Sequence, residues 1–203
     1  MGCVLQIWKL APLQMERLVK KQSGFTLVET MVACALAFIL LGIAIPAANA
    51  SIEAARSADA RSKLLQSLMQ AASRAGITGT RAVLCPSTEG VGCNDTFDWS
   101  NGWIVFMDRN GNREREPDET LINMVQALEG EARVHSTAGR TRIVFQGNAG
   151  NAGSNVSFTL CDGRGPGKAR SLIMSNTGNL RDAPVTEKAA LSTCPNLIFW
   201  ILK

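Results

Sequence analysis

The sequence of 203 residues lacks tyrosine, has one histidine, and is only 5% aromatic. No nucleophile elbow or phosphate-binding loop accompanies the single histidine, His135, and the glycines near residue 165 are isolated ones. Because catalytic sites are recognised by such groups of residues, we expect no enzyme, no cofactor and no metal site. His135 is expected to be an ordinary surface or sheet residue. The few aromatics also leave little with which to stack nucleic-acid bases.

Charge is missing from one long stretch. Residues 31–48 contain no charged side chain, and the apolar segment begins at Phe25. A helix of 24 residues is about 36 Å long at 1.5 Å per residue, enough to cross a hydrocarbon core of about 30 Å. An ordinary secretory signal has its small-residue cleavage site after the apolar segment, whereas here Gly24 lies before it, so such a signal is disfavoured. The sequence therefore predicts one membrane-spanning helix.

The residues that lead into this helix form a recognisable motif. Lys20 and Lys21 precede Gly24, and Phe25 and Glu29 follow it. This pattern resembles the type IV pilin and pseudopilin signature. The resemblance implies that a prepilin peptidase removes a leader of residues 1–24 and that the new N-terminal Phe25 is N-methylated. A plain signal anchor is the alternative.

Glu29 is an acid inside an apolar helix, and a charge there costs about 2.5–3.5 kcal/mol on insertion scales unless it finds a partner. The resemblance implies that its partner is the free amino terminus of a neighbouring subunit in a filament. A carboxylate that reaches back to water at the membrane surface is the alternative. We also expect translation to start at Met15 rather than Met1, which would give a short basic leader.

The rest of the chain predicts an α+β fold. Apolar residues at helical spacing continue the first helix to about Gly76, and β-rich runs then follow. We expect a type IV pilin-like arrangement in which a long N-terminal helix packs on an antiparallel β-sheet domain. Its parts are a filament-core helix at 25–49, an amphipathic helix at 50–77 and a periplasmic β domain at 78–203. The expected strands are 81–85, 103–107, 120–125, 141–145, 156–161 and 169–175, and the apolar run 197–202 is expected to be a buried last strand, with a partner-binding strand as the alternative.

Four cysteines lie in the predicted β domain: Cys85, Cys93, Cys161 and Cys194. An even number in an oxidising compartment favours disulfides, and four cysteines allow three connectivities. We favour Cys85 with Cys93 and Cys161 with Cys194. A zinc site is disfavoured because no paired C-x-x-C spacing is present. Cys34 lies in the apolar run and is interpreted as a small hydrophobic residue.

Two later segments of the sequence resemble one particular branch of the pilin superfamily. Residues 102–112 with 118–122, and residues 161–165 with 169–170 and 177–178, resemble the GspH/FimT family of minor pilins and pseudopilins. This implies a structural subunit, held in the bacterial inner membrane, that joins other pilins to build or prime a type IV pilus or a type II secretion pseudopilus.

The first of these segments also has the spacing of a calcium loop. Asp108, Asn110 and Asn112 alternate, and Glu119 stands at the closing position. Arg113, however, occupies the place of the required glycine. A solvated hairpin turn is therefore the preferred interpretation.

Some members of this family bind DNA through a G-R-x-R motif, to which residues 178–181 correspond here, with Asn179 in place of the first arginine. Without the leader the chain has 17 basic and 16 acidic residues, but residues 132–203 carry nine basic and three acidic ones. Arg164, Lys168, Arg170 and Arg181 are thus candidates for a patch that contacts the phosphates of double-stranded DNA. A solvated basic sheet edge is the equally weighted alternative.

Overall fold

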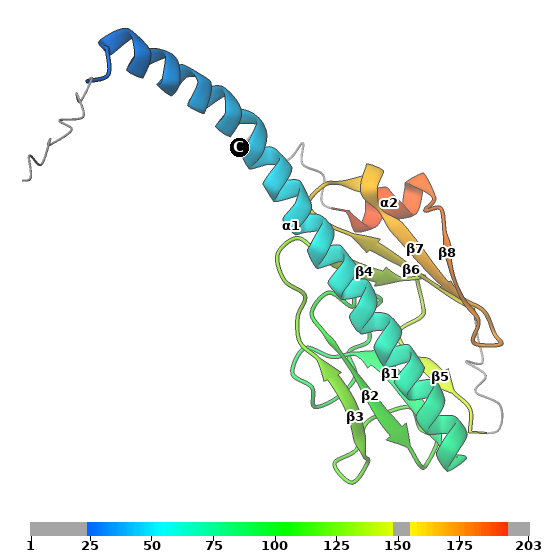
Figure 1. Ribbon diagram of the computed structural model, residues 1–203. Helices are drawn as coiled ribbons and strands as arrows, with labels where there is room; N and C mark the ends of the chain where they lie inside the picture. The colour runs from blue at the N-terminus through cyan, green and yellow to red at the C-terminus, as the bar shows by residue number, and fades with distance from the viewer. Residues whose placement is uncertain (1–23, 148–154, 195–203) are drawn as a thin grey trace, which may run out of the picture. The chain divides into compact units, whose positions relative to one another are not determined.

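The computed structural model describes residues 24–147 and 155–194 (Figure 1). Leader residues 1–23 with the alternative start sites, residues 148–154 and the last strand expected at 197–202 lie outside the described residues. The chain divides into two units, Met1–Gly42 and Ile43–Lys203, and each is described by itself.

The first helix, α1, spans Leu27–Thr78 and contains Pro46. Its end is two residues beyond the predicted one. Gly79 follows in the left-handed conformation (φ 70°), and its amide donates to the carbonyl of Ala75 (3.0 Å). Glycine adopts this backbone without a Cβ penalty, so the helix ends there.

The second half of α1 buries one stripe of residues, and the stripe is made mostly of small side chains with two leucines. Spacings of three and four residues keep these side chains on one face. Most of these residues belong to the hydrophobic core that the helix shares with the strands. The buried residues are Ser57, Ala60, Leu64, Ser67, Leu68, Ala71 and Ala75.

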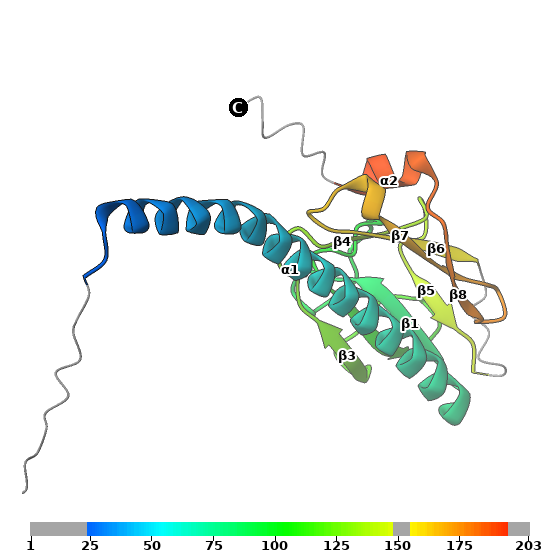
Figure 2. The same ribbon diagram turned by 45° about the horizontal axis from the view of Figure 1, so that its top comes forward.

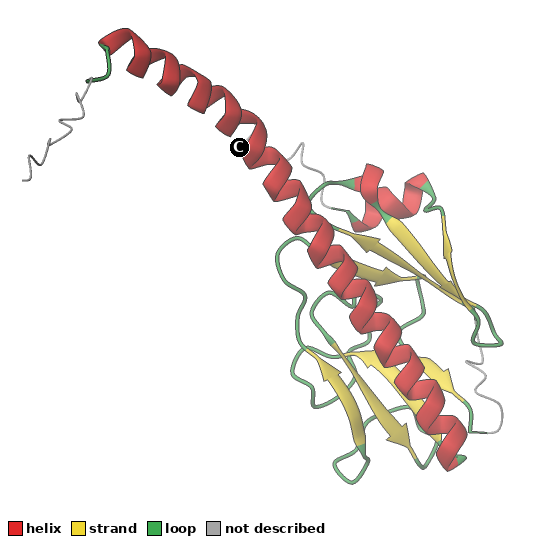
Figure 3. Cartoon of the chain, in the orientation of Figure 1, coloured by secondary structure: helices red, strands yellow, loops and turns green. Residues whose placement is uncertain are grey.

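The strands form two separate antiparallel sheets, where the sequence predicts one β domain (Figure 3). The first has the order β3-β2-β1-β5 and the second β4-β6-β7-β8. The strands are β1 Arg81–Pro86, β2 Trp103–Asp108, β3 Leu121–Val125, β4 Arg133–Ser136, β5 Ile143–Phe145, β6 Val156–Cys161, β7 Arg170–Met174 and β8 Leu180–Ala183.

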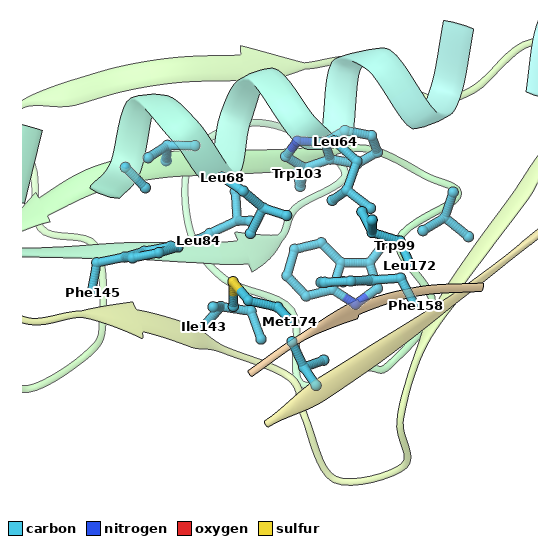
Figure 4. Packing of buried hydrophobic residues seen from close by; sticks show 14 of the residues in the cluster. Leu64, Leu68, Leu84, Trp99, Trp103, Ile143, Phe145, Phe158, Leu172 and Met174 are labelled. Carbon is cyan, nitrogen blue, oxygen red and sulfur yellow. The ribbon is translucent and has the colours of Figure 1, made fainter. Parts of the chain in front are cut away.

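One hydrophobic core joins the helix to both sheets (Figure 4). Leu64 and Leu68 of α1 point into a cluster in which Trp99 meets Phe158 edge to face, with ring centroids 5.4 Å apart. The indole N–H of Trp103 donates to the hydroxyl of Ser67 (2.9 Å), which satisfies a polar group that is fully buried. All buried residues in the described part lie between positions 57 and 194, so the unit from Ile43 onward contains this core complete.

Four of the described elements were not predicted from the sequence: β4, β8, a 3₁₀ turn at Pro166–Lys168 and a short helix, α2, at Glu187–Thr193. Thr186 caps α2 by accepting a hydrogen bond from the amide of Ala189. The helix lies against β6 on the side of the second sheet away from the main core (Figure 2). Ala190 is buried there between Cys161 and Cys194. A helix of seven residues is stable here because of this packing and the disulfide, not because of its propensity.

Candidate functional site

The segment around the expected cleavage point is open to solvent. Gly24, Phe25 and Thr26 are non-helical and exposed, and Phe25 is 80% exposed. No atom lies within 4 Å of the position that a Cβ on Gly24 would occupy. The Gly24–Phe25 bond therefore lies in accessible backbone directly before α1, the form of chain on which a peptidase can act.

The helix that follows is capped by the motif itself. The hydroxyl of Thr26 accepts a hydrogen bond from the amide of Glu29 (3.2 Å), as in the first half of a capping box. This fixes the start of α1 at Leu27. Glu29 thus lies in the first turn, where the helix dipole also favours a negative charge.

The first half of α1 is entirely exposed, although it is apolar. Its large side chains have no partner among the described residues, and α1 is the one helix among them that is long and apolar enough to cross a membrane. Glu29 is the one charged residue in α1 before Glu53. Cys34, in the same run, is unpaired and exposed.

The hairpin between β2 and β3 uses its acidic side chains to hold its own backbone. Asp108, 1% exposed, accepts hydrogen bonds from the amides of Gly111 (2.6 Å) and Arg113 (3.2 Å). Glu119, 4% exposed, accepts from the amide of Arg109 (2.9 Å). The oxygens that a calcium ion would require are engaged, so the hairpin interpretation stands. Its two acids, however, are buried rather than solvated.

Arg113 adopts a left-handed conformation (φ 65°) in this hairpin, at the position where a calcium loop has glycine. Its carbonyl accepts a hydrogen bond from Arg142 (3.0 Å), and Arg142 also pairs with Asp95 and Glu114. Arg142 therefore ties this hairpin to the loop between β1 and β2. It is a structural cation.

The disulfides in the structure join Cys85 to Cys93 and Cys161 to Cys194, with Cα atoms 5.5 and 5.3 Å apart. These are the pairs that the sequence analysis favours. The first closes the loop after β1, and the second ties the end of α2 to the end of β6. No group of three or more potential metal-binding side chains is present in ranges 24–147 and 155–194.

Arg164 is held in a structural ion pair. Its guanidinium donates to both carboxylate oxygens of Asp162 (2.8 and 2.7 Å), and its amide donates to one of them (3.0 Å). Asp162 is 1% exposed. Burial would raise the pKa of Asp162, but the hydrogen bonds and the charge of Arg164 outweigh it and hold that pKa below its ordinary value. Asp162 in turn raises the pKa of Arg164.

The same turn fastens the second sheet to α1. The amide of Gly163 donates to the carboxylate of Glu53 (3.0 Å), and a side chain at position 163 would press on Glu53. Glu53 also pairs with Arg56 one turn along the helix. Residues 161–165 therefore form a docking point between β6 and the helix.

The other basic candidates do not form one patch. Arg170 pairs in register with Leu160, a core residue, whereas Arg181 pairs with Ile173, which lies on the opposite face of the sheet. Since paired residues share a face and neighbours alternate, Arg170 and Arg181 lie on opposite faces. Lys168 lies in a short 3₁₀ turn before β7. Arg170 lines one hollow with Arg164 and Arg61, but Arg164 is paired with Asp162 and Arg61 with Asp182, so two of these three cations are already neutralised.

Asn179, which replaces an arginine in the family's DNA-binding motif, closes the β7–β8 hairpin. Its amide donates to the hydroxyl of Ser175 (3.2 Å), and its carbonyl accepts from the amide of that residue (3.0 Å). Gly178 supplies the left-handed turn (φ 80°). The segment 178–181 therefore forms the end of this tight turn and the start of β8.

The first half of α1 is an exposed, capped apolar helix with one acid in its first turn. The second half packs on antiparallel sheets. Together these features define a subunit of the type IV pilin class. The chain belongs to the family of the type II transport protein GspH, whose model matches residues 60–178. The prokaryotic N-terminal methylation motif matches residues 19–45. No curated protein matches the sequence.

Two crystal structures of the type IV minor pilin FimU of Pseudomonas aeruginosa (strain PAO1) are similar to this chain. In space group P65 the identity is 15% and the TM-score 0.48, over 68% of this chain and 98% of that one. In space group P21 the identity is 13% and the TM-score 0.49, over 72% and 98%. The family match, rather than this likeness, establishes that the chain is a structural pilin-type subunit. The methylation motif implies processing by prepilin peptidase and assembly with other pilins.

Proposed function

We propose that this chain is a minor pilin or pseudopilin that is cut between Gly24 and Phe25, methylated on Phe25, and held in the bacterial inner membrane by residues 25–49. The domain that follows lies in the periplasm until the subunit enters a type IV pilus or a type II secretion pseudopilus. The observation that carries the proposal is the accessible Gly24–Phe25 bond directly ahead of the capped apolar helix.

Glu29 is the assembly residue in this proposal. Inside a bundle of apolar helices its carboxylate needs a cation, and the methylated amino terminus of a neighbouring subunit supplies one. In the free subunit Glu29 is exposed, and its carboxylate makes no hydrogen bond or ion pair with another residue of the described ranges. The pair would therefore form between subunits, and it would set the register of the incoming helix.

Glu29→Gln removes the charge and keeps the size of the side chain. We expect normal cleavage after Gly24 but a fall in filament incorporation of roughly tenfold or more, the equivalent of about 1.4 kcal/mol. Glu29→Asp keeps the charge and should retain more assembly. Asp59→Asn is the matched control, because Asp59 is an exposed acid of α1 outside the apolar run. Immunoblots of sheared filaments measure incorporation; equal amounts of the Gln variant and the wild type would refute the charge pair.

DNA capture at a pilus tip remains a prediction, tested by binding of fragment 50–203 to duplex DNA at low and near-physiological salt. The placement of Arg170 and Arg181 on opposite faces limits how many phosphates one duplex contacts. Lys168 and Arg170 are close in the chain, so we count two cations that one duplex can contact. Since each phosphate contact contributes about −0.9 to the slope of log binding constant against log salt concentration, we expect a slope no steeper than about −2. A steeper slope would contradict the split placement and favour DNA capture.

A further inference from the structure

A groove of about 550 Å³ lies on the outer face of the second sheet, beside α2. We call it the α2 groove. Its floor comes from the outward residues of β6 and β7, which alternate with the core residues of the same strands. Its lining includes Phe97, Thr159, Ser171, Ile173, Val185 and Thr193.

The floor of the α2 groove is made mostly of short side chains, with the larger Ile173 beside them. Thr159 and Ser171 stand where bulkier residues would fill the space against α2. Its exposed surface is mostly apolar: Phe97 is 46% exposed, and Val185 packs beside the disulfide cluster, while the polar His135, Lys188 and Ser192 also line the groove. A face that was only solvated would not need apolar walls around a hollow floor.

The chain itself contains a segment that suits this groove. Residues 197–202 are six consecutive apolar residues without glycine or proline. They follow Cys194, which is 5% exposed and tied to β6 by its disulfide, and Thr193 already lines the groove. The described part of the chain therefore ends beside the groove, a few residues before this segment.

We propose that residues 197–202 dock into the α2 groove of their own subunit. Nine residues follow Cys194, and an extended chain of that length reaches about 30 Å, while four strands spaced by about 4.8 Å span roughly 15 Å. A tethered segment acts at an effective concentration in the millimolar range, so it outcompetes a second copy or another pilin for the same groove. Docking fills the α2 groove and covers the face of the second sheet that carries Arg181.

Trp200 reports on this docking. Fragment 50–203 keeps the complete core and has two other tryptophans, Trp99 and Trp103, both fully buried. Subtracting the fluorescence emission spectrum of the Trp200→Phe variant from that of the fragment gives the emission of Trp200 alone. We expect a blue-shifted maximum and weak acrylamide quenching, both independent of protein concentration over a hundredfold range and in a monomer by sedimentation.

Ile173→Lys places a charge on the floor of the groove and should shift the Trp200 emission to the red and raise its quenching several-fold. Ile77→Lys is the control, because Ile77 is 77% exposed at the end of α1 and does not line the groove. Unchanged emission of Trp99 and Trp103 in the Trp200→Phe background shows that Ile173→Lys folds; if it does not, Val185→Lys at the wall takes its place. The proposal is overturned if Trp200 is exposed in the wild type, ignores both groove variants, or is shielded only in dimers or only when lipid vesicles are added.

Discussion

Replacing Arg164 by alanine should destabilise the domain markedly, although the residue lies on a turn and is a candidate for DNA binding. Its guanidinium is the main partner of Asp162, which is 1% exposed. Breaking a buried ion pair by removing one partner costs about 3–5 kcal/mol. The Arg164 side chain is 25% exposed and the amide of residue 164 still donates to Asp162 in the variant, so we expect about 2–3 kcal/mol.

The assay is thermal and urea unfolding of fragment 50–203 with both disulfides intact. For a domain of this size each kcal/mol lowers the melting temperature by about 2–4 °C, so the expected loss is about 4–12 °C. Arg170→Ala is the control, because Arg170 is exposed at the start of β7, and it should change the free energy of unfolding by less than about 0.5 kcal/mol. Equal stabilities of Arg164→Ala and wild type would refute the structural role of the pair.

The pH dependence gives an independent test. In the wild type the pKa of Asp162 lies below its ordinary value of 3.8, so the ionised carboxylate stabilises the fold above that pH and the gain is lost as the pH falls through the lower, folded-state pKa. Without the Arg164 side chain, burial of Asp162 is opposed only by the remaining hydrogen bonds, so the pKa of Asp162 rises relative to the wild type and its ionisation stabilises the fold less. The loss of unfolding free energy in Arg164→Ala, relative to the wild type, should therefore be smaller at pH 3 than at pH 7. A deficit that does not change with pH would contradict the reasoning.

Three further changes test the core. Ser67→Ala removes the acceptor of the buried Trp103 N–H and should cost about 1–3 kcal/mol in unfolding experiments, whereas Ser67→Thr should cost less. Leu68→Ala should cost about 2–5 kcal/mol through the cavity it leaves, and a loss below 1 kcal/mol would show that the site collapses. Opening Cys161–Cys194, which closes a loop of 33 residues, should cost about 3–4 kcal/mol by unfolding of the double serine variant, and no loss would contradict the entropic account.

The long helix could be predicted from the sequence because its signals are local. The apolar run and the apolar residues at spacings of three and four act within one element. The end of the helix was predicted near Gly76, but Gly79 is the glycine that takes the left-handed conformation. The strands rich in β-branched residues, such as β6, were also predictable. β4 and β8 were not, because Arg133–Ser136 and Leu180–Ala183 are short and polar and become strands only by pairing with β6 and β7.

The basic patch shows where the sequence is insufficient. Arg170 and Arg181 are both basic and close in the chain, but the register of β7 and β8 decides which face each one occupies, and register depends on pairing across the sheet. The role of Arg164 did have a local signal: an acid two residues before it, across a glycine and next to a cysteine. An acid and a base two residues apart in a turn are close enough to form an ion pair with each other rather than with another molecule.

The central claim, that this chain is matured after Gly24 and built into a filament, is tested most directly by intact mass measurement of the chain recovered from sheared filaments. The account predicts a single species that begins at Phe25 and carries one methyl group on its amino terminus. A chain in the filament fraction that still carries residues before Phe25, or a chain found only in the membrane fraction when filaments are assembled, would contradict it.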